Sequence, residues 1–258
     1  MLGLDFAMPP SGFTKKPQLQ SPSPREPSGS SPCAACTVRE LAVCSVLEKG
    51  ELERLNSIMT NFRLSKGENL FYEGDDPNFV FNITGGTVQL SKLLPDGRRQ
   101  VIGYRDKGDF LGLTNSQTYN CSAEAITDVK LCKFRRVDLE SIFMEYPKLE
   151  SHLLSMTRNN LADTTEQLLL LGRKMAIERV ASFLLTLSDR AANRGEPDNP
   201  VFVAMGRHSV GDYLGLTTET VSRTLTRLKR RNVISLGNTL QSITILDKDQ
   251  LADLAGGY

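Results

Sequence analysis

The stretch Asp212-Tyr-Leu-Gly-Leu-Thr-Thr-Glu-Thr-Val-Ser-Arg223 contains the signals from which the fold can be predicted. One helix is expected to end at Gly215, and Thr217 is expected to cap the next helix, which runs to about Arg231. Ser209 resembles the start of a capping box for the first helix, with Asp212 in the place usually taken by Glu. The stretch therefore predicts two helices joined by a tight turn.

Expected strands flank this pair of helices. Residues 201–205 form one, while residues 233–236 and 242–246 form a hairpin around Gly237-Asn238. Helix, tight turn, helix and a two-stranded wing together make a winged helix-turn-helix. We expect this DNA-binding domain to occupy residues 173–258.

Three side chains near the start of the second helix are the candidates for reading bases. Glu219, Ser222 and Arg223 stand at i, i+3 and i+4, so they project from one helix face. Arginine can donate two hydrogen bonds to guanine, glutamate can accept from cytosine N4, and serine can contact either base type. The alternative is that this face is simply solvated.

Other polar side chains around this helix are candidates for holding phosphates, which sets the register of a protein on DNA without reading sequence. For the basic end of the helix, Lys229–Arg231, an alternative stays open, because the helix dipole favours cations there in any protein. The expected phosphate contacts are Arg207, Thr218, Arg227 and Arg230.

A long helix is expected over residues 148–172, just after Pro147. Apolar residues recur along it every seven positions, which is the spacing of a coiled-coil seam, although Thr157 and Thr164 weaken it. The helix could pack only on its own chain, but a lone helix after a barrel has only one face to cover, which favours pairing with a second copy. The seam positions are Leu154, Leu161, Leu168 and Met175.

Two acidic residues, Asp163 and Glu166, lie beside this expected seam. Their repulsion across a homodimer could hold two copies apart until another contact favours pairing. This hypothesis rests on position alone.

Between residues 51 and 147 the sequence changes to short strands separated by turns. Pro95-Asp96-Gly97 is a strong hairpin signal, and the glycines of residues 108–112 mark another bend. Many short strands at regular spacing predict a small antiparallel β-barrel or jelly roll. With the helices that follow, the expected fold class is α+β.

The composition limits the location and the kind of DNA binding. The net charge is only +1, so DNA binding must come from a local basic patch. Residues 1–32 are rich in proline and serine and are expected to be a disordered tail. No apolar run approaches the ~20 residues needed to cross a bilayer, and the start lacks the features of a signal peptide. We therefore expect a cytoplasmic protein that does not enter the membrane.

Cysteines form the other informative pattern. Cys33, Cys36 and Cys44 lie close together in an expected cysteine-rich segment, residues 33–50, whereas Cys121 and Cys132 lie far downstream. Clustered thiols in a reducing compartment more often bind metal than form disulfides. Four thiolates suit an iron–sulfur cluster or structural zinc, so one of the five cysteines must be spare.

Taken together, these features resemble the Crp/Fnr superfamily of bacterial transcription regulators. The resemblance covers nearly everything after the tail, and the stretch from Asp212 to Arg223 is its most specific part. The spacing Cys33-x2-Cys36-x7-Cys44 with a later cysteine resembles the oxygen-sensing FNR and FixK/FnrL-type branch. That branch implies a [4Fe–4S] cluster whose fourth ligand lies in the last barrel strand, which selects Cys132.

The resemblance also implies a mechanism. The cluster favours a homodimer, and the dimer binds an inverted repeat like TTGAT…ATCAA when oxygen is absent, with Glu219, Ser222 and Arg223 reading each half-site. Oxygen would dismantle the cluster and shift the equilibrium towards monomer. RNA polymerase is the expected protein partner.

Two other functions are less well supported by the residues. Cyclic nucleotide binding needs a cation for the phosphate, yet no Lys or Arg occurs between Lys107 and Lys130. An enzyme or electron carrier would leave the helix-turn-helix unexplained, and no acid–base constellation is present. The alternative that stays open is a regulator of the same superfamily without a cluster, which senses a small molecule or redox state.

Overall fold

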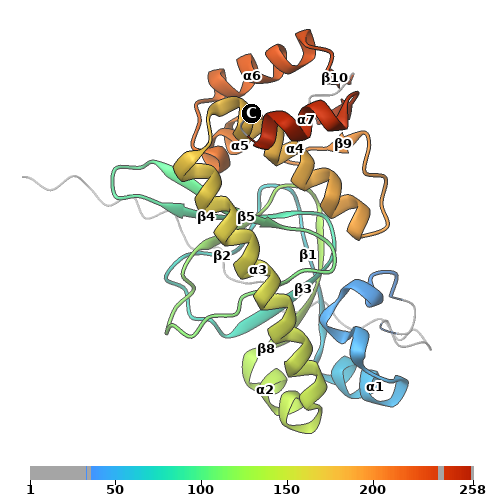
Figure 1. Cartoon of the computed structure of the whole chain (residues 1–258). Helices are drawn as coiled ribbons and strands as arrows, with labels where there is room; N and C mark the ends of the chain where they lie inside the picture. Colours follow the sequence, from blue (N-terminus) through green and yellow to red (C-terminus); the bar gives the residue numbers. More distant parts are fainter. Residues whose placement is uncertain (1–32, 34–35, 238–240, 257–258) are drawn as a thin grey trace, which may run out of the picture.

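A computed structural model describes residues 33, 36–237 and 241–256 of the 258-residue chain. The proline-rich stretch at residues 1–32 and the wing turn at Asn238 lie outside the described residues. Figure 1 shows a barrel in the lower half of the molecule, one long helix crossing it, and a helical domain above. The expected α+β class is confirmed.

The barrel consists of two antiparallel four-stranded sheets, ordered β1-β8-β3-β6 and β2-β7-β4-β5. Its interior is apolar, and the rings of Phe71 and Tyr119 stack there with centroids 3.9 Å apart. The Tyr119 hydroxyl donates a 2.6 Å hydrogen bond to the Phe79 carbonyl, so the ring is also fixed by a polar contact. The strands are β1 Thr60–Leu64, β2 Asn69–Phe71, β3 Phe79–Gly85, β4 Val88–Leu93, β5 Arg99–Arg105, β6 Phe110–Leu111, β7 Ser122–Ala125 and β8 Val129–Arg135.

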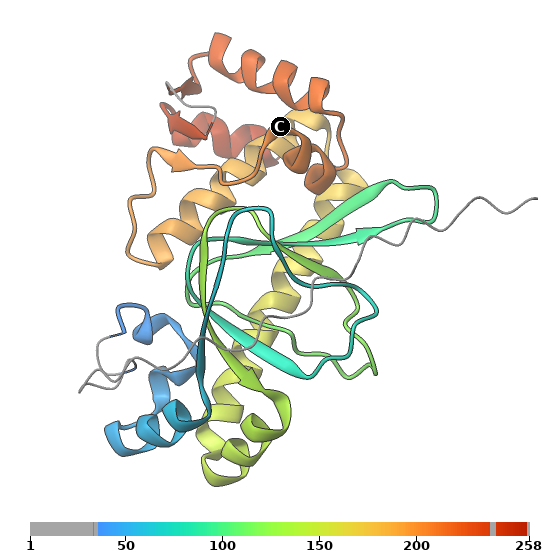
Figure 2. The same ribbon diagram turned by 180° about the vertical axis from the view of Figure 1, so that it is seen from behind.

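The cysteine-rich segment lies at one end of the barrel beside the long helix, in both views of the molecule (Figures 1 and 2). It forms two short 3-10 helices, η1 Arg39–Leu41 and η2 Val43–Val46, followed by α1 Lys49–Ile58. A glycine permits its close approach to the barrel bend. A Cβ on Gly108 would lie 2.7 Å from Cβ of Leu41, and φ is +94° there.

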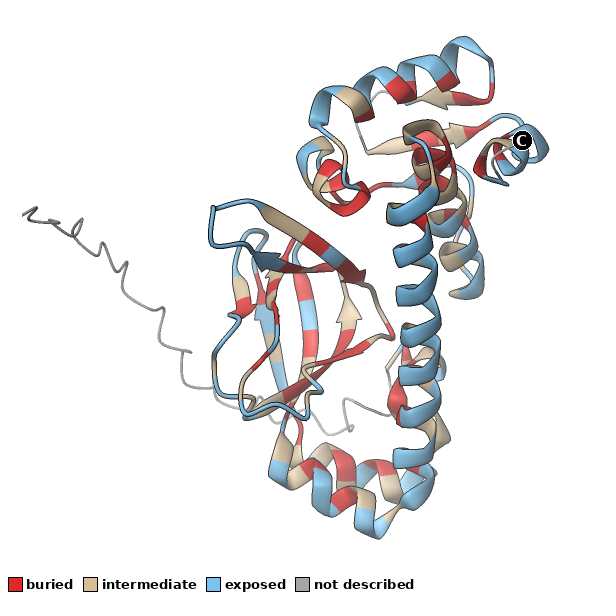
Figure 3. Ribbon diagram, turned by 60° about the vertical axis from the view of Figure 1, so that its left-hand side comes forward, coloured by how far each residue is buried: buried red, intermediate tan, exposed pale blue. Residues whose placement is uncertain are grey.

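The long helix α3 spans Pro147–Arg173 and follows α2, Arg136–Glu145. Its buried side chains are Leu149, Leu153 and Leu170, and much of the remaining surface is exposed (Figure 3). Met175 is not part of this helix, because it caps the start of α4, Ala176–Asn193. The expected fourth position of the seam was therefore wrong. None of the described helices is long and apolar enough to cross a bilayer.

The remaining elements form the winged helix-turn-helix. Gly215 ends α5 in the left-handed conformation, at φ 62°, and the Thr217 hydroxyl accepts a hydrogen bond from the Thr220 amide, as expected. The capping box at Ser209 was wrong, because α5 begins two residues earlier after Gly206. The elements are β9 Val201–Phe202, α5 Arg207–Leu214, α6 Thr218–Arg230, β10 Ile234–Leu236, β11 Ser242–Ile245 and α7 Lys248–Gly256, with sheet order β10-β11-β9.

One glycine sets how closely α5 approaches the turn before α6. A Cβ on Gly211 would lie 2.6 Å from the Leu216 carbonyl oxygen and 3.5 Å from the Thr218 amide nitrogen. We expect Gly211→Ala to lower the free energy of unfolding by about 1–3 kcal/mol, because the turn must move. Urea unfolding followed by circular dichroism measures this.

Gly172→Ala is the matched control, since Gly172 is also helical but has no atom within 4 Å of the added Cβ. It should be neutral or stabilising by up to about 1 kcal/mol. Equal stability of the two variants would show that the turn is not held at the observed distance.

Candidate functional site

Helix α6 is strongly amphipathic, which decides the face that it can offer to DNA. Val221, Thr224, Leu225 and Leu228 are buried against the rest of the domain. Glu219, Ser222 and Arg223 are exposed on the opposite side. The three side chains expected to read bases therefore lie on the free face of the helix.

Two of these side chains orient each other. The Arg223 guanidinium donates a 2.6 Å hydrogen bond to the Glu219 carboxylate, with 78% and 70% of their side chains exposed. An ion pair this exposed contributes little stability. The Ser222 hydroxyl donates to the Thr218 carbonyl at 2.9 Å. The three side chains thus make hydrogen bonds within α6 and remain accessible from solvent.

The same face is slightly hollowed, with a volume of about 480 Å³. Thr226 lies in this hollow and was missed from the sequence, although it stands at i+4 from Ser222. Thr218 is exposed at the start of α6, whereas Arg207 is half-buried and its burial lowers the pKa of the guanidinium. The hollow is lined by Ser222, Arg223, Thr226, Arg227 and Arg230.

The proposed dimer seam lies on the uncovered face of α3. Leu154, Leu161 and Leu168 expose 52%, 67% and 68% of their surface. Figure 3 shows that α3 is exposed along most of its length. The hydroxyls of Thr157 and Thr164 donate to carbonyls of α3 itself, so these polar residues do not need a partner across the seam.

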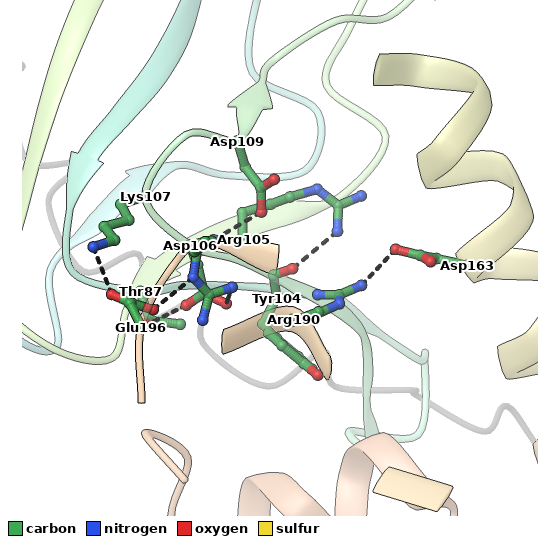
Figure 4. A network of polar contacts seen from close by, with 10 residues as sticks. Thr87, Tyr104, Arg105, Asp106, Lys107, Asp109, Asp163, Arg190 and Glu196 are labelled. Atoms are coloured by element: carbon green, nitrogen blue, oxygen red, sulfur yellow. Dashed lines mark hydrogen bonds and ion pairs between the residues drawn. The ribbon is translucent and has the colours of Figure 1, made fainter. Parts of the chain in front are cut away.

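Asp163 is not a free charge beside the seam, which corrects one expectation. Its carboxylate accepts a 2.6 Å hydrogen bond from Arg190 of α4 (Figure 4). The Arg190 guanidinium also lies over the Tyr104 ring, 4.7 Å from its centroid. Within the described part of the chain Glu166 has no ion pair, so repulsion across a dimer would rest on Glu166 alone.

Four of the five cysteines lie around one end of the barrel. Cys33, Cys44 and Cys132 pack against the apolar cluster formed by η2, α1, α2 and α3 with the outer side of the barrel. Burial, and then the charges of Cys33, Cys36 and Cys44, raise the pKa of the Cys132 thiol to about 12. Cys33, Cys36 and Cys44 thus all lie near enough to Cys132 to influence the charge of its thiol.

Cys121 is separate from this group. It is buried in the barrel interior beside Phe71 and Tyr119, in the other apolar cluster. Burial raises the pKa of its thiol, and the charged residues that influence it are Glu73, Lys92 and Arg105. In the described residues, no three His, Cys, Asp or Glu side chains already have the arrangement of a metal site.

The cysteine-rich segment also touches the long helix. Ser45, next to Cys44, has its hydroxyl 3.2 Å from Nε2 of His152 on α3. Cys33 lies 3.5 Å from the Asn56 side-chain oxygen of α1. A change in the segment around Cys44 can therefore reach the helix that bears the seam.

Comparison with known proteins decides the family. A Crp-like helix-turn-helix domain model matches residues 178–254, and a cyclic nucleotide-binding domain model matches residues 61–146. The nitrogen fixation regulation protein FixK of Bradyrhizobium diazoefficiens is 37% identical over 230 residues, which cover 89% of this chain and 96% of FixK. This chain belongs to the Crp/Fnr family of transcription regulators.

Two further members of the family support the same conclusion. The transcriptional activator protein FnrL of Cereibacter sphaeroides is 35% identical over 228 residues, which cover 87% of this chain and 92% of FnrL. The solved structure of FixK2 from Bradyrhizobium japonicum has a TM-score of 0.71 and 34% identity, and covers 76% of this chain and 97% of that one. The chain is thus a DNA-binding regulator of the FixK and FNR type, and the relatives are regulators rather than enzymes.

The two kinds of DNA contact can be told apart by substitution. Arg223→Ala should lose about 1–3 kcal/mol of discrimination at the guanine of each half-site, because it shares the first turns of α6 with Glu219 and Ser222. Arg230→Ala should weaken binding to all sequences alike and lower the salt dependence, as expected for a phosphate contact.

Binding is measured without air, on the inverted repeat and on a version with the guanines changed. Arg230→Ala serves as the control for the loss of a positive charge from the same helix. If Arg223→Ala prefers the original guanines by the wild-type margin, Arg223 does not read that base.

Proposed function

We propose that this regulator responds to oxygen, and that in the absence of air its dimer binds an inverted repeat like TTGAT…ATCAA. In this proposal Cys33, Cys36, Cys44 and Cys132 hold a [4Fe–4S] cluster, which supplies an oxygen-sensitive group when bound. The observation that carries the proposal is the grouping of Cys132 with the N-terminal cysteines, while Cys121 lies in a different core.

The residues at this site fit such a group chemically. Four sulfur donors with apolar surroundings match the preference of iron–sulfur clusters for cysteine thiolates shielded from water. Asn82 lies directly across from Cys132 in the β3–β8 pair, and its side-chain oxygen is buried without a hydrogen-bond partner among the described residues. A buried polar atom of this kind leaves room for a hydrogen-bond donor, such as a water, beside Cys132.

The protonation of the cysteine thiols also bears on whether they can bind a metal. Burial raises the pKa of Cys44 to about 11, with a smaller contribution from the charges of Cys33 and Cys36. Near pH 7 Cys44 and Cys132 therefore carry their protons when no metal is bound. Ligation must release these protons, since a thiolate is the form that binds.

A route from the cysteines to the DNA follows from the contacts of η2. Ordering of the segment around Cys44 would fix the contact between Ser45 and His152 and so favour one position of α3. A shift of a few kcal/mol is enough to change the population of a dimer. Two α6 helices would then face successive turns of an inverted repeat.

The remaining parts of the proposal concern partners and location. A dimer bound at a promoter would contact RNA polymerase, and a protein whose target is DNA would work in the cytoplasm. We propose no role for a cyclic nucleotide, because the barrel interior is filled by apolar side chains such as Phe71, Phe81 and Ile83.

A second candidate function, a regulator without a cluster that senses a small molecule, is favoured by one observation. A cleft of about 680 Å³ lies at one side of the contact between the barrel and the DNA-binding domain, and Thr87, Tyr104, Lys107, Arg194 and Glu196 are among its lining residues. The visible spectrum of protein purified without air separates the two candidates, since only the first requires bound iron and sulfide.

The ligand assignment predicts which cysteines are needed. Cys33→Ser, Cys36→Ser, Cys44→Ser and Cys132→Ser should each abolish cluster assembly, because four thiolates are required. Cys121→Ser is the matched control and should retain the cluster. Iron and sulfide analysis after reconstitution without air measures this.

Normal iron and sulfide in Cys132→Ser, with loss in Cys121→Ser, would reverse the assignment of the fourth ligand. Iron-free protein with bound zinc would instead identify a structural zinc site.

The seam predicts opposite effects for two variants of α3. Leu161→Ala should weaken pairing even without air, by roughly 2–5 kcal/mol if the side chain is fully buried in the dimer. Glu166→Ala should favour the dimer in air, because it removes a like charge beside the seam. Sedimentation with and without air measures the monomer–dimer balance.

Leu93→Ala is the control, since Leu93 is as exposed as Leu168 but lies on the β4–β5 hairpin. An unchanged balance in both Leu161→Ala and Glu166→Ala would show that this face of α3 is not the interface.

A further inference from the structure

The C-terminal turn of α5 is held in an unusual way. A helix leaves its last carbonyl groups without partners from its own backbone. Here the Gly211 carbonyl accepts from the backbone amides of Gly215 and Leu216. The next three carbonyls, those of Asp212, Tyr213 and Leu214, receive their hydrogen bonds from side chains of other elements.

Each of these three donors comes from a different part of the molecule. Gln100 of β5 in the barrel donates its side-chain amide to the Asp212 carbonyl at 2.6 Å. Gln167 of α3 donates to the Tyr213 carbonyl at 2.7 Å. Arg179 of α4 donates to the Leu214 carbonyl at 2.8 Å. The end of α5 is therefore the point where barrel, long helix and DNA-binding domain meet.

Arg179 extends this junction to the end of the long helix. Besides the Leu214 carbonyl, its guanidinium donates to the carbonyls of Leu171, at 3.0 Å, and Lys174, at 2.8 Å. One side chain thus joins the last turn of α3 to the last turn of α5. Gln167 stands between Glu166 and Leu168 in the sequence, so the proposed seam and the end of α5 are linked by adjacent residues.

Side chains of α5 fasten the same turn to the barrel. The Asp212 carboxylate pairs with Arg99 of β5 at 2.9 Å, and the Tyr213 ring packs 5.5 Å from that of Tyr104. A second set of ion pairs bridges the domains near Arg194, which lies 3.4 Å from Asp106 (Figure 4). The barrel and the DNA-binding domain are therefore docked over a continuous surface.

This docked surface also buries polar groups that lower its stability. In the described part of the chain, the side-chain amide of Gln89 and the hydroxyl of Tyr104 are buried without hydrogen-bond partners. Gln89 and Tyr104 are directly opposite each other in the β4–β5 pair, so both lie on the docked face. Unpaired buried groups lower the stability of the arrangement that buries them. The hydrogen bonds to α5, together with the ion pairs and the apolar packing between the domains, offset this cost.

The direction of α6 depends on this turn. Only Gly215, Leu216 and Thr217 separate the two helices, and the close approach at Gly211 holds them as a unit. We propose that Gln100, Gln167 and Arg179 are positioning residues that set the direction of α6 relative to the barrel and the dimer seam. They thereby fix the spacing of half-sites that a dimer accepts. The inference rests on the proposed dimer and inverted repeat.

Near-isosteric variants that lose the donor test this role. Gln100→Met, Gln167→Met and the double variant are compared with Gln117→Met, because Gln117 is exposed and its side chain makes no hydrogen bond to the described residues. Binding is measured without air to a duplex with one half-site, and to inverted repeats whose spacers differ in steps of one base pair. Sedimentation reports dimer formation.

We expect half-site affinity and dimer formation to stay within about twofold of wild type. Affinity for the preferred spacing should fall about fivefold to tenfold for each single variant, the size of one net hydrogen bond. The preference for that spacing should shrink by the same factor, whereas Gln117→Met should keep it. A wild-type spacing preference in the double variant would overturn the proposal. A loss of half-site affinity as large as the loss at the preferred spacing would also overturn it, because it would indicate damage to the DNA-binding domain itself.

Hydrogen exchange provides a second test that needs neither DNA nor a dimer. Amides of residues 215–217 should exchange faster in Gln100→Met and Gln167→Met than in Gln117→Met. Unchanged exchange would contradict the proposal even if the wild-type protein bound no inverted repeat. Absence of a spacing preference in the wild type, together with faster exchange in the variants, would instead contradict the proposed function and leave the positioning role supported.

Discussion

Leu154, Leu161 and Leu168 form an apolar stripe along α3 that the protein's own chain leaves uncovered, and the other parts of the molecule are arranged around this helix. Its first half packs against the cysteine-rich segment through the apolar cluster that includes Leu149 and Leu153. Its end is joined to the DNA-binding domain by Arg179. Exposed leucines in one row favour association, because pairing removes apolar surface from water. A change at either end of α3 would therefore affect the proposed pairing of two copies through these leucines.

Coupling of this kind needs no large movement. The contact between Ser45 and His152 joins the segment of Cys44 to α3, and Gln167 joins α3 to α5. Each is one hydrogen bond, with a net contribution of about 1 kcal/mol. A few such contacts that exist in one state and not in another provide the bias that moves a two-state equilibrium. The unpaired groups of Gln89 and Tyr104 lower the stability of the docked arrangement, so the contacts that hold it have to offset this cost.

The helix-turn-helix could be predicted from the sequence because its signals are local. Gly215 and Thr217 act through their own backbone and side-chain preferences, and the structure has both as expected. One local signal failed, because Ser209 resembled a cap but α5 starts earlier without any side-chain cap. Contacts that depend on distant residues were missed. The charge of Asp163 is paired by Arg190, from another helix. Gln167 and Gln100 give no sequence signal, since a glutamine that donates to a distant carbonyl resembles any surface glutamine.

The two halves of the proposed mechanism depend on different chemistry. Contacts of Arg227 and Arg230 with phosphates would release counterions, so DNA affinity depends strongly on salt. The side chains that donate to the last carbonyls of α5, those of Gln100, Gln167 and Arg179, all reach uncharged acceptors, so these hydrogen bonds are weakened less by screening than ion pairs are. The direction of α6 can thus stay fixed while the strength of DNA binding follows ionic conditions. In the proposed mechanism the direction of α6 selects the DNA site, whereas the basic side chains set the affinity. The state of α3 acts on the direction of α6.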